Sequence, residues 1–109
     1  MPELTRKEEQ ILLAVHFLQN DAYLITIRDR IKEMTGKEYA VGTIYAPLNR
    51  LHINGYLDSY LKATKESNKP VRYYRVTKQG YEALAELKKL TEEMWAGFAY
   101  PVFESLDYL

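Results

Sequence analysis

The sequence feature that most constrains the fold is a pair of helical patterns joined by a short connection. In the first pattern Ile27, Ile31 and Met34 recur at helical spacing before Gly36, a residue type that favours the left-handed conformation ending a helix. In the second, residues 41–54, apolar residues recur at i, i+4 and i+7 before another glycine. Because only residues 36–40 separate the patterns, they predict a helix-turn-helix.

The predicted helix 41–54 has a buried face and an outward face. Ile44, Leu48 and Leu51 share the buried face. The outward face is poor in acidic residues and holds Thr43, Ala46, Pro47, Arg50 and Asn54. Such a face is either ordinary solvated surface or the face of a helix that enters a groove, and features elsewhere in the chain are needed to distinguish the two.

A helix is also predicted near the N-terminus. Thr5 and Glu8 have the spacing of a capping box, which marks a helix start. The apolar stripe that follows is Ile11, Leu12, Val15 and Leu18. After this helix, residues 23–25 predict a short strand, and Thr26 is expected to cap the helix that contains Ile27.

A β-hairpin is predicted after Gly55. Residues 56–61 and 71–76 are β-favouring, and the polar segment 62–70 between them predicts a long, basic loop. Tyr74 and Val76 alternate with their neighbours, Tyr73 and Arg75, so only one of the two pairs is expected to face the core.

A last helix is predicted from a cap at Thr77. Apolar residues follow at alternating spacings of three and four: Leu84, Leu87, Thr91, Met94 and Phe98. This heptad-like seam is too apolar for so small a domain to cover alone, which predicts a second copy of the chain as its partner. We therefore divide the chain into residues 1–76, which hold the predicted helix-turn-helix and hairpin, and residues 77–109, a dimerisation helix with an aromatic tail.

Composition limits the class of protein. The chain has 109 residues, 47% hydrophobic and 28% charged, which predicts one ordered globular unit of modest size. It contains no cysteine, and neither a signal peptide nor a membrane-spanning run is evident, so we expect a soluble cytoplasmic protein without disulfides or membrane contact. The net charge is zero, yet basic residues are in excess over residues 1–76, most densely between Ser59 and Val76, where phosphates could bind locally.

Several short motifs together resemble a known family. They are Gly42-Thr43-Ile44-Tyr45, Leu48, Arg50-Leu51, Gly55-Tyr56-Leu57, Arg72-Tyr73-Tyr74-Arg75-Val76-Thr77 and Gly80. In this order and spacing they are similar to the signature of PadR-like transcriptional regulators. The resemblance implies a mainly α-helical winged helix-turn-helix with a β-hairpin wing, a C-terminal dimerisation helix and a repressor function, with release by a small molecule in some members. The short C-terminal part is similar to that of small members without a separate effector domain.

The resemblance and the charges together assign DNA contacts. Arg50 suits either a bidentate contact to guanine or a clamp on phosphate, and the wing lysines and arginine suit the phosphate backbone. The predicted contacts with double-stranded operator DNA are Thr43, Tyr45, Asn49, Arg50, Lys65, Lys69 and Arg72. Thr43 and Asn49 are equally explained as plain surface, and Tyr45 as a packing residue.

The last helix carries the predicted homodimer interface, with Leu84, Leu87, Met94, Trp95 and Phe98. Packing between two chains is one interpretation of Trp95, and a pocket for a small hydrophobic effector is the other. His16 and His52 have no acidic residue at ligand spacing, so we assign no metal and no cofactor. With no phosphate loop and no nucleophile beside a base, we do not expect an enzyme.

The chain departs from the family pattern at three positions. Ala40 stands where relatives often have a serine cap, Pro47 lies one residue later than the usual proline, and His52 replaces a common glutamate. The zero net charge, Ala40 and Pro47 support an alternative function, a winged-helix module that no longer binds DNA and binds other proteins through its aromatic tail.

Overall fold

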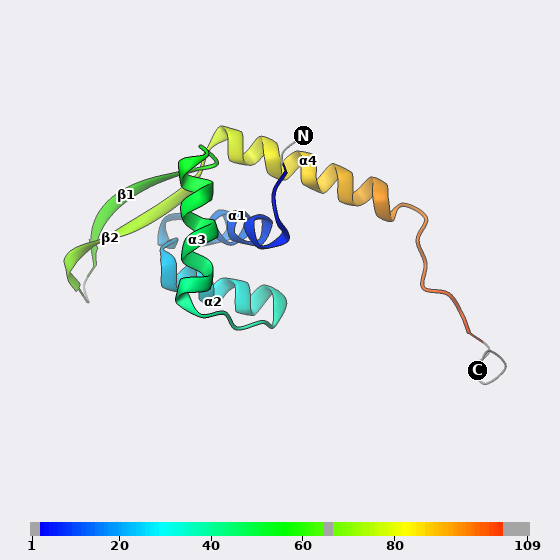
Figure 1. Cartoon of the computed structure of the whole chain (residues 1–109), viewed down its shortest axis with the longest axis horizontal. Coiled ribbons are helices and arrows are strands. Elements are labelled where there is room, and N and C mark those ends of the chain that lie inside the picture. The colour runs from blue at the N-terminus through cyan, green and yellow to red at the C-terminus, as the bar shows by residue number, and fades with distance from the viewer. Residues whose placement is uncertain (1–2, 65–66, 104–109) are drawn as a thin grey trace.

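The computed structural model describes residues 3–64 and 67–103, and within them the chain is mainly α-helical with one β-hairpin (Figure 1). The elements are α1 (Arg6–Leu18), a 3-10 turn η1 (Gln19–Asp21), α2 (Leu24–Thr35), α3 (Val41–Ile53), β1 (Leu57–Thr64), β2 (Ser67–Val76) and α4 (Lys78–Trp95). The predicted fold class, a winged helix-turn-helix followed by a C-terminal helix, is confirmed.

The core lies where α1, α2 and α3 meet the base of the hairpin. Its fully buried members include most of the predicted apolar residues of these helices: Ile11, Leu12 and Val15 of α1, Ile27 and Ile31 of α2, and Ile44, Leu48 and Leu51 of α3. Pro47 is also buried, although we predicted it on the outward face. The α3 helix continues through Pro47, so this proline packs against the core and leaves the outward face narrower than expected.

The predicted capping box begins α1. The backbone N–H of Glu8 donates to Thr5 Oγ1 at 3.1 Å, and the backbone N–H of Thr5 donates to Glu8 Oε1 at 2.9 Å. The start of α2 differs from the prediction, because Tyr23 and not Thr26 is its N-cap. Thr26 lies inside the first turn, where its hydroxyl accepts from the backbone N–H of Tyr23. Only Tyr23 of the predicted strand 23–25 pairs with the hairpin, through a single bridge to Tyr73.

The strands of the hairpin are longer than predicted. The strands pair in antiparallel register from Leu57 opposite Val76 to Thr64 opposite Ser67, with an irregularity between Lys62 and Thr64, so most of the predicted polar loop is strand. Tyr73 and Tyr74 are both buried, against the expectation of one buried pair, because each packs on its own side of the hairpin. In Figure 1 the hairpin extends away from the helices as a wing.

Two small residues fix the junction between the wing and α4. The hydroxyl of Thr77, the predicted cap, accepts from the backbone N–H of Gly80 at 3.0 Å and donates to the carbonyl oxygen of Gly55 at 2.7 Å. A Cβ atom at Gly80 would overlap the carbonyl oxygen of Tyr56. Glycine is therefore required where the first turn of α4 crosses the chain leaving α3.

The second half of α4 extends beyond the rest of the molecule, on the side opposite the wing (Figure 1). Its end carries Met94 and Trp95, which are 68% and 59% exposed. Phe98, which we included in the helical seam, lies after the helix end, beyond Gly97 with its positive φ of 77°. In the part of the chain that the structure describes, no helix combines the length and apolar character needed to span a bilayer.

Candidate nucleic-acid interface

The exposed surface of α3 has a centre and two edges, set by the helical spacing. Gly42, Ala46, Asn49 and Ile53 follow the centre. Thr43 and Arg50 share one edge, and Tyr45 and His52 share the other. The helix lies across the front of the molecule in Figure 1, with α1 and α2 behind it and the wing to one side.

One edge of α3 faces the wing across a hollow of about 490 Å³. Tyr45, Asn49 and His52 of α3 line it, together with Arg72 and Tyr74 of β2. The structure therefore brings three of the predicted DNA contacts, Tyr45, Asn49 and Arg72, to one place. Tyr45 is half exposed, and burial raises the pKa of the Tyr74 hydroxyl while the nearby Arg72 opposes that rise.

Ser59 joins Arg72 to α3. Arg72 Nη1 donates to Ser59 Oγ at 2.7 Å, and the same oxygen lies 3.0 Å from His52 Nε2. Since a guanidinium can only donate, the hydroxyl accepts from Arg72 and its own proton is available to His52. His52 also packs edge-on against Tyr74, with ring centroids 6.0 Å apart. The two side chains that link the wing to α3, Ser59 and His52, were absent from our sequence-based set.

The Arg50 side chain lies toward α1 and away from the wing. Its Nε atom lies 3.8 Å from Glu8 Oε2, a carboxylate whose side chain is only 8% exposed and which also caps α1. The Arg50 side chain itself is 54% exposed, so the pair contributes little to stability. Of the four α3 residues predicted to contact DNA, Thr43 and Arg50 thus lie apart from Tyr45 and Asn49.

The cations of the wing are divided between its two sides by the strand alternation. Arg72 lies on the side of α3, whereas Lys62 and Arg75 lie on the other, where they stack over Tyr73 and Tyr60 at 5.0 and 5.5 Å from the ring centroids. Lys69 is exposed near the tip of β2. Lys65, also predicted to contact phosphate, lies outside the described residues.

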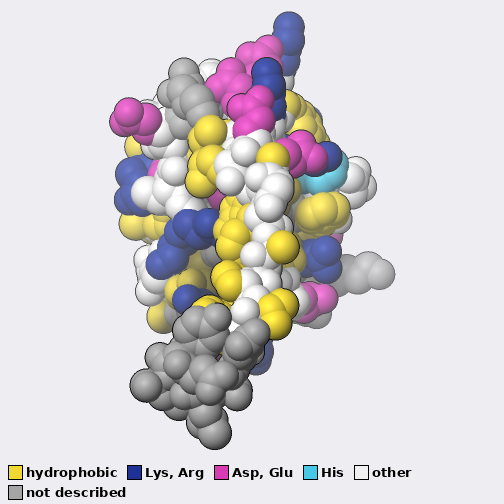
Figure 2. Space-filling view, turned by 90° about the vertical axis from the view of Figure 1, so that its right-hand side faces the viewer, with side chains coloured by type: hydrophobic (Ala, Val, Ile, Leu, Met, Phe, Trp, Pro, Cys, Tyr) yellow, Lys and Arg dark blue, Asp and Glu magenta, His cyan; other side chains and the backbone are white. Residues whose placement is uncertain are grey.

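A second surface is formed by α1 and α4. A hollow of about 580 Å³ runs between them, lined by Leu13 and Phe17 of α1 and by Tyr81, Leu84 and Ala85 of α4 among others. Figure 2, which looks onto the end of the molecule that carries the C-terminus, shows hydrophobic side chains gathered in a band with charged side chains on its flanks.

Of the five predicted interface residues, Leu84 lines this hollow and the other four do not. Leu84 and Leu87 are half-buried, whereas Met94, Trp95 and Phe98 are exposed at the far end, with the Trp95 and Phe98 rings edge to face at 5.2 Å. Leu13 and Phe17 were missed by the sequence analysis. Their spacing of four residues outside the core stripe of α1 was the available signal.

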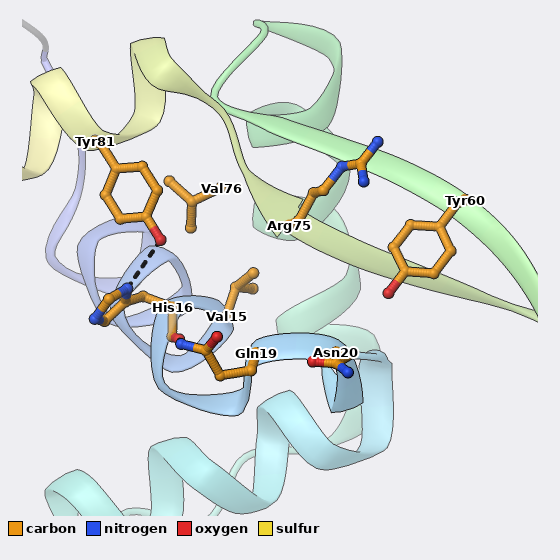
Figure 3. A pocket seen from close by; sticks show the side chains of 8 residues that line it. All are labelled: Val15, His16, Gln19, Asn20, Tyr60, Arg75, Val76 and Tyr81. Atoms are coloured by element: carbon orange, nitrogen blue, oxygen red, sulfur yellow. Dashed lines mark hydrogen bonds between the residues drawn. The ribbon is translucent and has the colours of Figure 1, made fainter.

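A hydrogen bond holds α1 and α4 together beside the base of the wing. His16 Nδ1 and the Tyr81 hydroxyl are 2.9 Å apart, and Figure 3 shows the two side chains pointing toward one another. They border a hollow of about 250 Å³ whose far side is formed by Tyr60 and Arg75 of the wing. His16 therefore has a structural contact to α4. Within residues 3–64 and 67–103, no group of three or more His, Asp or Glu side chains is placed to hold a metal ion.

Comparison with protein families gives one match over most of the chain. Residues 12–86 match the model of the transcriptional regulator PadR-like family. No curated protein matches the sequence.

Solved structures share the fold. A PadR-like transcription factor from Bacteroides fragilis is 29% identical, with a TM-score of 0.70 over 82% of this chain and 85% of that chain. RosR of H. salinarum is 22% identical, with a TM-score of 0.70 over 89% of this chain and 82% of that one. A PadR family transcription regulator from Clostridium difficile R20291 is 22% identical, with a TM-score of 0.67 over 83% of this chain and 90% of that one.

Proposed function

This chain belongs to the PadR-like family of transcriptional regulators, which bind DNA. We propose that it acts as a dimer that represses transcription from an approximately palindromic operator. One observation carries the proposal: the exposed face of α3 and the cationic wing lie side by side around the hollow between Asn49 and Arg72. A helix of this size fits the major groove, and a basic hairpin beside it reaches the neighbouring phosphates.

The DNA contacts divide into two groups. Thr43, Tyr45, Asn49 and Arg50 of α3 would meet the major groove and its edges. Lys69 and Arg72 of the wing, with Lys65 outside the described residues, would neutralise phosphates. Residues 1–76 would then form the DNA-binding domain and residues 77–109 the dimerisation region.

The second copy would cover the surface between α1 and α4. Phe17 lines the hollow between the two helices, whereas Met94, Trp95 and Phe98 lie at the end of α4 or just beyond it. Each is more than half exposed, and large exposed apolar side chains of this kind mark interaction sites. A two-fold axis there would pair the surface with itself and present two α3 helices to successive major grooves. A small hydrophobic effector bound beside Trp95 would act on the same interface.

One observation favours the alternative of a protein-interaction module. The segment after α4 exposes Tyr100 and Val102, by 79% and 90%, outside any helix or strand. A partner protein could bury these side chains without any involvement of α3.

A gel shift with DNA from upstream of the protein's own gene tests the proposal, since many repressors act on their own promoters. We expect binding on the order of a thousandfold tighter than to random DNA of the same length at physiological salt. Absence of binding there and to fragmented genomic DNA at low salt would overturn the proposal and favour the interaction module.

A further inference from the structure

The centre of the exposed α3 face carries no charge. Gly42, Ala46 and Asn49 succeed one another along it, and Ile53 ends the line. The two small residues let the helix backbone approach a surface closely. The only side chain on this line that can both donate and accept hydrogen bonds is the amide of Asn49.

Ile53 is 72% exposed, more than any other isoleucine or leucine in the described part of the chain. Burying it against another apolar group would be favourable, whereas exposure to water is not. In the major groove, the apolar group that a base pair offers is the C5-methyl of thymine. An asparagine amide matches the N6 donor and N7 acceptor of adenine in the same way.

Arg50, which could read guanine, is placed less well for that purpose. It lies on the edge of the exposed face, and its Nε is 3.8 Å from the nearly buried carboxylate of Glu8. To reach a base edge at the centre of the groove, Arg50 would have to turn away from Glu8 toward the centre of the face. With α3 in the major groove, the phosphates that flank the groove would lie beside the edges of the helix, and Arg50 is on one of these edges.

We infer that α3 reads A·T base pairs in the major groove, with Asn49 hydrogen-bonded to adenine and the methyl groups of Ala46 and Ile53 against thymine methyls. The inference rests on the proposed function, because it requires α3 to enter the major groove. It adds the chemical class of base pair that the helix selects.

Four alternating copolymer duplexes, dA-dT, dA-dU, dG-dC and dI-dC, test it without knowledge of the operator. Inosine shows the groups of guanine in the major groove but lacks its minor-groove amino group. Fluorescence anisotropy would measure the affinity of the full chain for each duplex at several salt concentrations, so that the phosphate contribution can be separated.

We expect dA-dT to bind on the order of tenfold tighter than dG-dC. The dI-dC duplex should bind as weakly as dG-dC, and dA-dU should be about threefold weaker than dA-dT for each thymine methyl that α3 contacts. Equal affinity for dI-dC and dA-dT would overturn the inference, because the protein would then be reading the minor groove or its width. Equal affinity for all four would also overturn it, while failure to bind any duplex would overturn the proposed function itself.

Substitutions identify the residues. Asn49→Ala should reduce the preference for dA-dT over dG-dC by about tenfold, and Ile53→Ala should reduce the difference between dA-dT and dA-dU. Asn20→Ala, in the exposed turn η1, is the matched control and should leave both preferences unchanged. Thermal unfolding would check that each variant is folded. A folded Asn49→Ala variant with the full preference for dA-dT would contradict the inference.

Discussion

Arg72 and Ser59, on opposite strands of the wing, are joined by a hydrogen bond of 2.7 Å from the guanidinium to the hydroxyl oxygen. Because the same oxygen lies 3.0 Å from Nε2 of His52 near the end of α3, one hydroxyl links the side chain proposed to hold phosphate to the helix proposed to read bases. These two contacts of the Ser59 hydroxyl hold the Arg72 side chain in one orientation relative to α3 in the absence of DNA.

Ser59→Ala tests this link. Removal of the hydroxyl leaves Arg72 free to move, so we expect DNA affinity to fall several-fold, with a loss of about 1 kcal/mol in the free energy of unfolding. Fluorescence anisotropy and urea denaturation measure the two effects. Ser59→Thr retains a hydroxyl and a strand-favouring side chain, and should keep most of the affinity. If Ser59→Ala bound DNA as tightly as the natural chain, the link would have no part in binding.

Arg50→Ala tests the role of the edge of α3. Since Arg50 lies beside Glu8 and away from the centre of the face, we expect it to clamp a phosphate. Its loss should then weaken operator and random DNA alike and reduce the slope of log K against log salt by about one unit per contact. Lys69→Ala on the wing should behave in the same way and serves as the reference. A loss of about 1 to 3 kcal/mol confined to the operator would instead identify Arg50 as a reader of guanine.

Much of this architecture was predictable from the sequence. The periods of apolar residues located α1, α2 and α3, because residues such as Ile11, Ile31 and Leu48 form the buried face that each pattern predicts. A similar pattern located α4, although the apolar residues of that pattern are half-buried or exposed in the single chain. The capping box at Thr5 and the cap at Thr77 were also predictable, since both are local. The extent of the strands was not, because residues 62–64 and 67–70 lie in strands held by backbone pairing, which polar side chains do not reveal.

The candidate site was predicted only in part. Tyr45, Asn49 and Arg72 do converge, but the roles of Ser59 and His52 depend on the register of the hairpin against α3, which no local pattern specifies. Arg50 and Glu8 are far apart in the chain, so no local pattern predicts that their side chains lie close together. Leu13 and Phe17 become candidates for an interface only when α4 lies beside α1.

Met94→Glu and Phe17→Glu test the proposed dimer surface. Each would place a carboxylate against the partner in an apolar contact, so we expect monomers in sedimentation velocity at concentrations where the natural chain is dimeric. Both side chains are largely exposed in the single chain, so its fold should be retained. Glu86→Lys, on the other side of α4, is the control and should remain a dimer. Dimers formed by both glutamate variants would exclude this surface as the interface.

Trp95 provides a direct test of an effector. It is the only tryptophan of the chain, so tryptophan emission reports the surroundings of this one side chain. If a flat apolar compound binds beside it as proposed, the emission should change saturably and DNA affinity should change with it, as linkage requires. A saturable change in fluorescence with constant DNA affinity would mean that the compound binds without regulating the protein.

The most direct test of the account is the distance between the two α3 helices of a dimer. The chain has no cysteine, so Ala46→Cys on the exposed face of α3 gives one site per protomer for a spin label. Double electron–electron resonance should give a single distance of about 34 to 36 Å, widened by the label arms, because successive major grooves on one face of the duplex have that spacing. Absence of any dipolar coupling, or a distance of less than about 25 Å, would contradict a dimer that presents α3 to two adjacent major grooves.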